Sequence, residues 1–166
     1  MAKNRSEILQ MVVAEWDITS NGTLAAGALS YGCNTTTAGG GQTNKVILPE
    51  GALITRAWTY CTTAITDDGD NSTTASLGYT GATAAFIALV AINTVQYSAG
   101  IGMTLIDNYA LDGGALTALN MAIARDATMI ALTTDVEVLL TINNDHAVDA
   151  GKIALFIEYV QTGDLS

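Results

Sequence analysis

A two-residue alternation of apolar and polar side chains in the last third of the chain constrains the fold most. Residues 135–143 (DVEVLLTIN) and 152–160 (KIALFIEYV) both follow it, and each run collects Val, Leu, Ile or Tyr side chains on one face. This period, combined with β-branched and aromatic residues, is typical of half-buried antiparallel strands. The connector, residues 144–151 (NDHAVDAG), contains the turn-forming residues Asn, Asp and Gly. The sequence therefore predicts that the chain ends in a long β-hairpin.

The segments before this hairpin are predicted to be mostly extended. Residues 82–92 are an exception, because their Ala and Leu content favours a helix of about three turns. Residues 103–109 and 114–125 fit neither period, so we expect a loop with some irregular strand there. The predicted strands are residues 45–48, 52–65 and 73–79, with 67–72 (DDGDNS) as a hairpin tip and 129–132 as a short extended segment.

These elements predict a mainly β fold of one domain, with about seven to nine strands and one or two short helices. Such a pattern favours an antiparallel β-sandwich or jelly roll over a parallel α/β sheet, which needs repeated crossover helices. We expect residues 1–18 to be an N-terminal arm or a first strand. Residues 19–44 are expected to be a flexible loop region with a weak strand in 24–31, and residues 45–166 to be the sandwich body.

The charge balance excludes some partners. The chain has 16 acidic and 6 basic residues, a net charge of −10. An acidic surface repels phosphate, so we expect no nucleic-acid partner, whereas a basic protein surface would be attracted. The most apolar window, residues 84–92, is less than half as long as a membrane span requires, and residues 8–13 are too short for the core of a signal peptide. We therefore expect a soluble protein made in the cytoplasm, with no membrane partner.

The best candidate for a ligand site is the acidic tip with Asp67, Asp68, Asp70 and Asn71. Clustered carboxylate and amide oxygens on a loop suit Ca²⁺, which takes six to eight oxygen ligands. The spacing does not match an EF-hand, and Asp and Asn are common at hairpin tips because they tolerate turn geometry. We therefore expect a turn here and keep Ca²⁺ binding as the alternative.

No group of residues predicts catalysis. His146 is the sole histidine, and it lies between Asp145 and Asp149 without a nucleophile motif nearby, so we expect an exposed turn residue. Cys33 and Cys61 lack the further ligands of a zinc site, and we expect two buried or half-buried thiols rather than a disulfide. The chain is therefore expected to be no enzyme and to hold no cofactor.

The aromatic residues do not form a regular ladder that would stack sugars or bases. Trp58 and Tyr60 share one face of the predicted strand 52–65. We expect one of them to pack in the core and the other to lie near an edge or an interface.

Several segments together resemble a family of small proteins encoded by tailed phages beside the major capsid gene. The similarity lies in an apolar strand, the Pro-x-Gly-Ala-Leu-Ile-Thr-Arg run, an aromatic strand, an acidic tip, a Leu-Gly strand and a final Gly-Lys-Ile strand ending in Phe-Ile-Glu-Tyr. It covers about half of the chain, and residues 1–44 and 93–130 depart from it. In this sequence the matching segments are residues 46–48, 49–56, 58–65, 67–71, 75–79 and 151–160.

This resemblance implies a capsid decoration, or cement, protein. Such proteins are compact β-sandwiches or jelly rolls, often homotrimers, that bind the major capsid protein on the outside of the virion. The resemblance thus implies a virion location, and an N-terminal segment that orders on docking. It also implies an apolar surface for subunit contacts, and we expect the Ala/Gly-rich residues 82–91 and 113–124 to allow close subunit approach. The interface residues expected in that segment are Ile8, Met11, Val12 and Trp16, and deletion of residues 2–15 is expected to abolish capsid binding while leaving the fold.

Two other functions remain open at this stage. A receptor- or glycan-binding module of a tail or fibre would present aromatic side chains at loop tips. A small metal-dependent hydrolase would use Asp67 and Asp70 in a concave acidic pocket.

Overall fold

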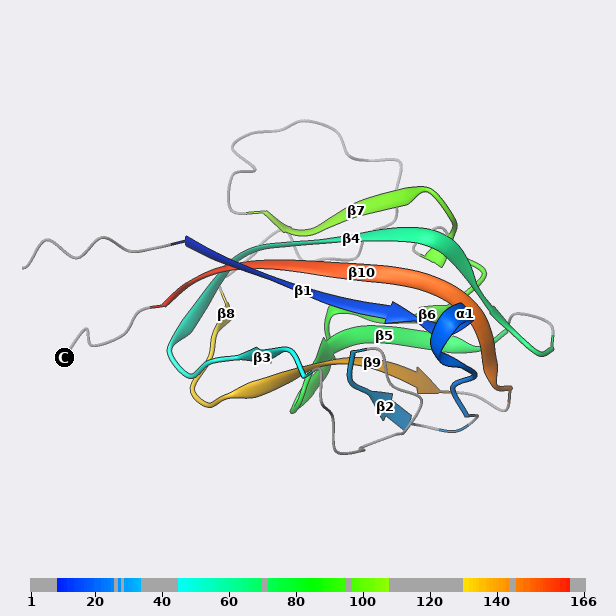
Figure 1. The fold of residues 1–166 in the computed structure, drawn as a ribbon. Helices are drawn as coiled ribbons and strands as arrows, with labels where there is room; N and C mark the ends of the chain where they lie inside the picture. Colours follow the sequence, from blue (N-terminus) through cyan, green and yellow to red (C-terminus); the bar gives the residue numbers. More distant parts are fainter. Residues whose placement is uncertain are drawn as a thin grey trace, which may run out of the picture.

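The computed structural model describes residues 9–25, 27, 29–33, 45–69, 72–94, 97–107, 130–143 and 146–161. These residues form two antiparallel sheets packed face to face, a β-sandwich, as the alternation predicts. One sheet has the order β1-β10-β4-β7 and the other the order β2-β9-β5-β6, which Figure 1 shows as an upper and a lower layer. The strands are β1 (Leu9–Asp17), β2 (Leu29–Tyr31), β3 (Ile47–Leu48), β4 (Ala52–Asp67), β5 (Thr74–Tyr79), β6 (Ala82–Ala91), β7 (Ile101–Asp107), β8 (Ile130–Ala131), β9 (Val136–Asn143) and β10 (Val148–Gln161), and the helix is α1 (Ile18–Asn21).

The strand pairing is nested, which identifies the sandwich as a jelly roll. β1 pairs with β10, β2 with β9, β4 with β7 and β5 with β6, all antiparallel. This is the pattern of one long antiparallel ribbon rolled up into two sheets, as in the jelly rolls of capsid and lectin domains. The short strands β3 and β8 add to β9 and β4 respectively.

The predicted terminal hairpin is wrong, although both of its strands exist. β9 pairs with β5, β2 and β3, whereas β10 pairs with β4 and β1, so the two strands belong to different sheets. The same holds for β4 and β5, which the sequence predicted to meet at a hairpin tip. A strand with one buried face has the same alternation whether its sequence neighbour lies beside it or across the sandwich, and period alone does not distinguish the two.

The predicted helix at residues 82–92 is also wrong, because this segment is strand β6. It pairs with β5 through the tight turn Thr80-Gly81, where Gly81 has φ +90°. Its pairing has register shifts, and Phe86 and Ile87 are buried consecutively. Pairing with β5 and burial outweigh the helix propensity of Ala and Leu, which is a weak preference.

Of the two possibilities for the N-terminal segment, the described part is a first strand. Leu9 to Asp17 pair with Val160 to Lys152 without a register shift. Deletion of residues 2–15 would therefore remove most of β1 from its sheet, so the expectation that this deletion leaves the fold does not stand. Within residues 19–44 the structure places the single-turn helix α1 and β2, and Leu24 bridges to Val148.

The core lies between the two sheets and closes at the β1–β2 edge. Ala14 and Trp16 of β1 face inward, and Trp16 donates from Nε1 to the carbonyl oxygen of Tyr31 on β2 at 3.1 Å. Trp16 is 1% exposed, so this hydrogen bond satisfies a donor that has no access to water. The largest fully buried side chains are Trp16, Tyr31, Tyr97, Leu24, Leu48, Ile54, Leu77, Ile92, Leu140, Ile142, Ile153 and Leu155.

Gly151 provides a test of how closely β10 packs on β4. It has φ +130°, and a Cβ at this position would lie 2.7 Å from the Cα of Ile65. Gly100 has φ +76°, but a Cβ added there would have no other atom within 4 Å. We expect Gly151→Ala to lower the free energy of unfolding by about 3 kcal/mol or more, from backbone strain together with overpacking. Gly100→Ala should cost only about 1–2 kcal/mol, because it has the strain alone.

Urea denaturation of the two variants and of the wild type measures this difference. Equal losses at the two positions would show that the close approach to Ile65 does not limit the packing.

Candidate interaction surface

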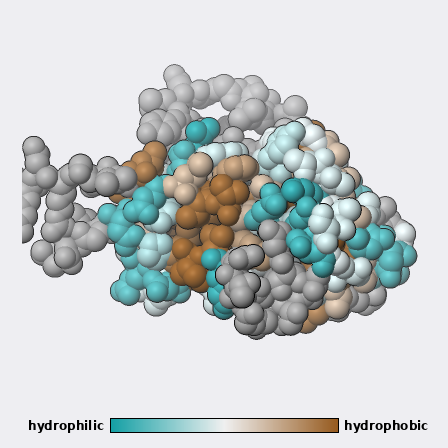
Figure 2. All heavy atoms as spheres, in the orientation of Figure 1, coloured by the Kyte–Doolittle hydropathy of each residue, from teal (hydrophilic) through white to brown (hydrophobic). Residues whose placement is uncertain are grey.

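An exposed apolar surface, which we call the β1–β3 side, lies along the edge of the sandwich formed by β1 and β3. Leu9 and Met11 are each 56% exposed, Val13 is 41% exposed, and Ile47 of β3 is 42% exposed. Figure 2 shows hydrophobic atoms gathered along β1 and continuing toward β3, with hydrophilic atoms on both sides of them. Contiguous apolar surface bordered by polar residues is typical of a protein–protein contact.

The alternation of β1 explains which residues form this surface. Residues two apart in a strand point to the same face, so Leu9, Met11 and Val13 face outward while Ala14 and Trp16 face the core. The first three lie on the outer face of their sheet, where Met11 is opposite Glu158 and Val13 is opposite Phe156 of β10. Of the interface residues predicted from the resemblance, Met11 is thus exposed and Val12 is partly buried against the core. Trp16 is buried, which removes it from the accessible surface, and Ile8 lies outside the described residues.

Cys33 covers the C-terminal half of β1 at this edge of the sandwich. Its thiol is hydrogen-bonded to the backbone of Glu15 on β1 and to the backbone of Val46 just before β3. Burial raises the pKa of Cys33 to about 11, and the two backbone hydrogen bonds lower it only in part. The C-terminal half of β1 is therefore covered by residue 33, whereas Leu9, Met11 and Val13 are not.

Charges lie at the border of the β1–β3 side and are paired there. Lys152 Nζ lies 3.1 Å from Asp17 Oδ2 and 3.3 Å from Glu15 Oε1. The pKa of Asp17 is lowered, first by the hydrogen bond from the Ser20 amide and then by Lys152, and the pKa of Lys152 is raised by Asp17 and Glu15. At the opposite border Lys45 pairs with Glu137 at 3.2 Å.

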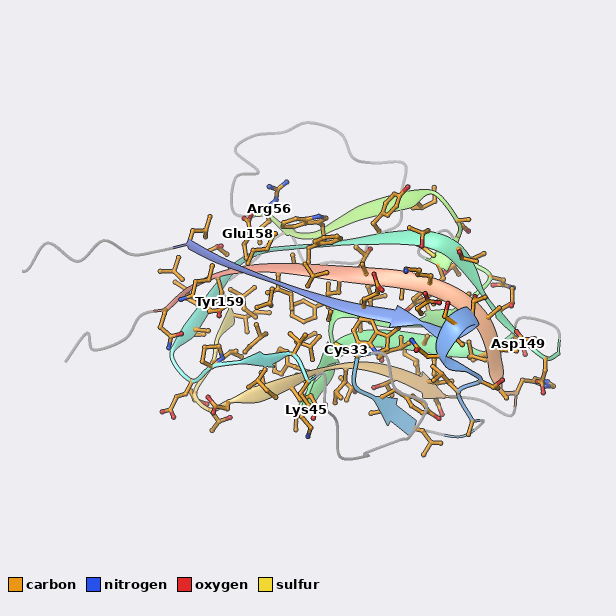
Figure 3. The ribbon with its side chains drawn as sticks, in the orientation of Figure 1. Cys33, Lys45, Arg56, Asp149, Glu158 and Tyr159 are labelled. Carbon is orange, nitrogen blue, oxygen red and sulfur yellow. The ribbon has the colours of Figure 1, made fainter. Side chains whose placement is uncertain are left out.

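The outer face of the β1-β10-β4-β7 sheet carries an aromatic cluster. The rings of Trp58 and Phe156 stack with centroids 5.3 Å apart and an interplanar angle of 3°, and the Arg56 guanidinium lies 4.9 Å from the Trp58 centroid. Figure 3 shows Arg56 and Glu158 on this outer face and Tyr159 on the inner one. Tyr60, also on the outer face, is 44% exposed.

The expectation that Trp58 or Tyr60 packs in the core is wrong, and a β-bulge is the reason. Between Ile54 and Arg56 the register of β4 against β10 shifts by one residue. Inward positions therefore change from Ala52 and Ile54 to Ala57, Thr59 and Cys61. A one-residue shift moves every later side chain to the other face, which places Trp58 and Tyr60 outside.

The described part of the acidic tip holds two turns together. Asp67 is buried and accepts from the backbone amides of Gly69 and Thr73, both at 3.0 Å. Asp68 accepts from the Ala147 amide at 3.2 Å and lies 3.5 Å from His146 Nδ1. These carboxylates thus fix the β4–β5 and β9–β10 connections side by side, as expected for turn residues.

The remaining ligand-site predictions have different outcomes. Asp70 and Asn71 lie outside the described residues, and the described residues contain no group of three or more His, Cys, Asp or Glu placed to hold a metal ion. His146 is partly exposed at its turn, as expected, with its side chain 42% accessible. Cys33 and Cys61 are both buried free thiols, as expected.

A second apolar surface, the β6 side, lies at the opposite edge of the sandwich and is formed by residues 82–91, one of the two Ala/Gly-rich segments expected to allow close subunit approach. Among the described residues β6 has a strand neighbour on one side only, β5, and its exposed residues include Ala84, Ala88 and Leu89. Leu89 is 46% exposed. A second sequence signal for this surface is the absence of charge from residue 71 to residue 106, in a chain with 16 acidic residues.

Comparison with known proteins supports the fold. No protein-family model and no curated protein matches the chain. Among solved structures, a chain of the cyanophage Pam1 capsid asymmetric unit is similar, with a TM-score of 0.55 and 13% sequence identity. The alignment covers 96% of this chain and 91% of that chain. The similarity therefore identifies a shared fold over nearly the whole of both chains.

Among the described residues there is no helix of the length and hydropathy needed to span a bilayer.

The reactivity of the two thiols reports how tightly the edge covered by Cys33 is packed. Burial raises the pKa of Cys33 and of Cys61 to about 11, so at pH 8 only about one thiol in a thousand is the reactive thiolate. We expect iodoacetamide to leave both thiols of the native protein unmodified over an hour at pH 8 and to alkylate both in urea. Mass spectrometry of the intact protein gives the count. Rapid alkylation of Cys33 in the native protein would show that the edge between β1 and β3 opens.

Proposed function

We propose that this chain is a structural virion protein that binds the outside of a phage capsid as a homotrimer and stabilises the contacts between capsid subunits. The observation that carries the proposal is the similarity of fold to a chain of a phage capsid asymmetric unit, because it extends over 96% of this chain and 91% of that one. The segments that resemble phage decoration proteins are consistent with the same role.

The described surface suits a protein that acts by adhesion rather than by catalysis. The β-sandwich presents exposed apolar side chains on its edge strands, while Asp67 and Asp68 of the acidic tip are engaged in turn contacts. A decoration protein needs a rigid body with interaction surfaces. Many copies, each with a modest interface, add up to a large effect on a shell through multivalency. We therefore propose a role without enzymatic activity.

The net charge indicates the kind of capsid surface that would receive it. At −10 the chain is attracted to a basic protein surface and repelled by nucleic acid. Electrostatic attraction of this kind raises association rates and is screened by salt. Capsid binding should accordingly weaken as the salt concentration rises.

A receptor- or glycan-binding module is the second candidate, and one observation favours it. Tyr60 is exposed on the outer face that also carries the stacked Trp58 and Phe156 rings, and lectins are among the proteins with jelly-roll folds. An aromatic surface of this kind could stack on a sugar ring.

Deletion of the gene from the phage that encodes this chain tests the role. We expect virions to assemble without the protein but to lose infectivity on heating at least about tenfold faster, a barrier change of about 1.4 kcal/mol. Purified protein added to these particles should bind and restore the rate, and binding should fall with added NaCl. Absence of the protein from wild-type virions would contradict the proposal. Unchanged heat stability with lost adsorption to host cells would instead favour the receptor-binding module.

A further inference from the structure

The outer faces of the two sheets carry different kinds of side chain. On the outer face of the β2-β9-β5-β6 sheet the side-chain oxygens of Ser30 and Thr141 are hydrogen-bonded to each other at 2.9 Å, and Glu137 is paired with Lys45. The described part of the chain exposes six large apolar side chains, and four of them lie on the outer face of the β1-β10-β4-β7 sheet. These four are Leu9, Met11, Val13 and Tyr60. Large apolar side chains gathered on one face indicate which face meets a partner.

We call this second surface the β10 face, because β10 runs through its middle. Residues that are opposite each other in the strand register point to the same side of a sheet. The β10 face is therefore formed by the outward residues of three neighbouring strands: Leu9, Met11, Val13, Glu15, Asp17, Lys152, Ala154, Phe156, Glu158, Arg56, Trp58 and Tyr60.

Aromatic and aliphatic side chains form the centre of the β10 face. The register places Val13 opposite Phe156, and Phe156 opposite Trp58. Tyr60 is opposite Gly102 of β7, and a Cβ added to Gly102 would lie 3.4 Å from Cδ2 of Tyr60. The Tyr60 ring thus lies against the β7 backbone and remains 44% exposed. Tyr, Trp, Phe, Met and Arg are the residues enriched in protein–protein interfaces, and the β10 face contains all five.

Arg56 and Glu158 are opposite each other on β4 and β10, but they do not form an ion pair. The Arg56 guanidinium lies instead 4.9 Å from the centroid of Trp58, and Figure 3 shows both charged side chains on the outer face. The ion pairs within the described part of the chain include neither residue. Glu158, which is opposite the exposed Met11, therefore has no cation paired with it among the described residues.

This charge distribution favours a basic protein surface as the partner. A contact that covers Glu158 without supplying a cation would leave a carboxylate desolvated and unpaired, which is costly. The β10 face has three acidic residues and two basic ones, and the whole chain has a net charge of −10. A second copy packed on this face would bring further carboxylates toward it. A basic surface supplies the missing cation and is attracted by the chain as a whole.

We infer that the β10 face is the surface that docks on the capsid, and that a Lys or Arg side chain of the capsid protein pairs with Glu158 there. Aliphatic and aromatic contacts with Met11, Val13 and Tyr60 surround this ion pair. The inference rests on the proposed function, since it names the surface through which the chain would bind the shell.

Two pairs of matched variants test the inference on virions that lack the protein because its gene is deleted. In the first pair, Glu158→Gln and Glu137→Gln each remove one carboxylate from a strand, and the two residues lie on the outer faces of different sheets. In the second pair, Tyr60→Ala and Leu89→Ala each shorten a large side chain of similar exposure, 44% and 46%. Circular dichroism melts check that each variant is folded.

We expect Glu158→Gln and Tyr60→Ala each to raise the Kd for these virions at least about tenfold, because a charge partner and an aromatic contact are lost. Glu137→Gln and Leu89→Ala should change the Kd less than about twofold. Co-sedimentation of labelled protein with the virions gives the Kd values.

The outcomes separate the inference from the proposed function. Wild-type protein that fails to bind these virions would contradict the proposed function itself. Wild type that binds, with all four variants binding equally well, would show that another surface docks. Equal losses in Glu158→Gln and Glu137→Gln would show that net charge acts without a specific pair, which would overturn the inference. A wild-type oligomer that Tyr60→Ala dissociates in light scattering would place a second copy on the β10 face, and the inference would be wrong.

Discussion

The pairing of β10 with β4 is the contact on which the rest of the structure depends. These two long strands form the centre of one sheet. The chain crosses from this sheet to the other between β4 and β5, and it crosses back between β9 and β10. Asp67 and Asp68 hold these two connections together through the amides of Gly69, Thr73 and Ala147. Each sheet has one apolar face, so its strands become stable only when these connections place the two apolar faces against each other.

The surface shows a division that follows from the same rolled ribbon. Outer strands β1 and β6 have only one strand neighbour each among the described residues, and both expose uncharged side chains there. Carboxylates lie in the turns and also on the strands, as Glu15, Glu137 and Glu158 do. In the turns several of them accept backbone hydrogen bonds, as Asp135 does from the Glu50 amide at 2.7 Å. The apolar side chains exposed on the edge strands thus lie beside charged ones, with Met11 opposite Glu158 and Ile47 opposite Glu137.

Sequence reasoning recovered the fold class and most strand positions, and it failed where neighbours in space decide the structure. The alternation in 135–143 and 152–160 located β9 and β10 but could not tell a hairpin from a crossover between sheets. Residues 82–92 have a helix-favouring composition, and only pairing with β5 makes them a strand. The side of β4 on which Trp58 lies depends on one bulge near Thr55, which no local pattern reveals. For the interaction surface, Met11 and the small residues of 82–91 were both named with the resemblance, although the second segment was expected to be a helix and is strand β6.

The position of Cys33 has a consequence for the durability of the molecule. Its thiol is enclosed between the backbones of Glu15 and Val46, and Cys61 bonds to the carbonyl oxygens of Thr63 and Tyr97. Sulfur oxidation starts from an accessible thiolate, and neither side chain provides one. The two thiols should therefore stay free in reducing and in oxidising surroundings, as the virion role proposed above would require.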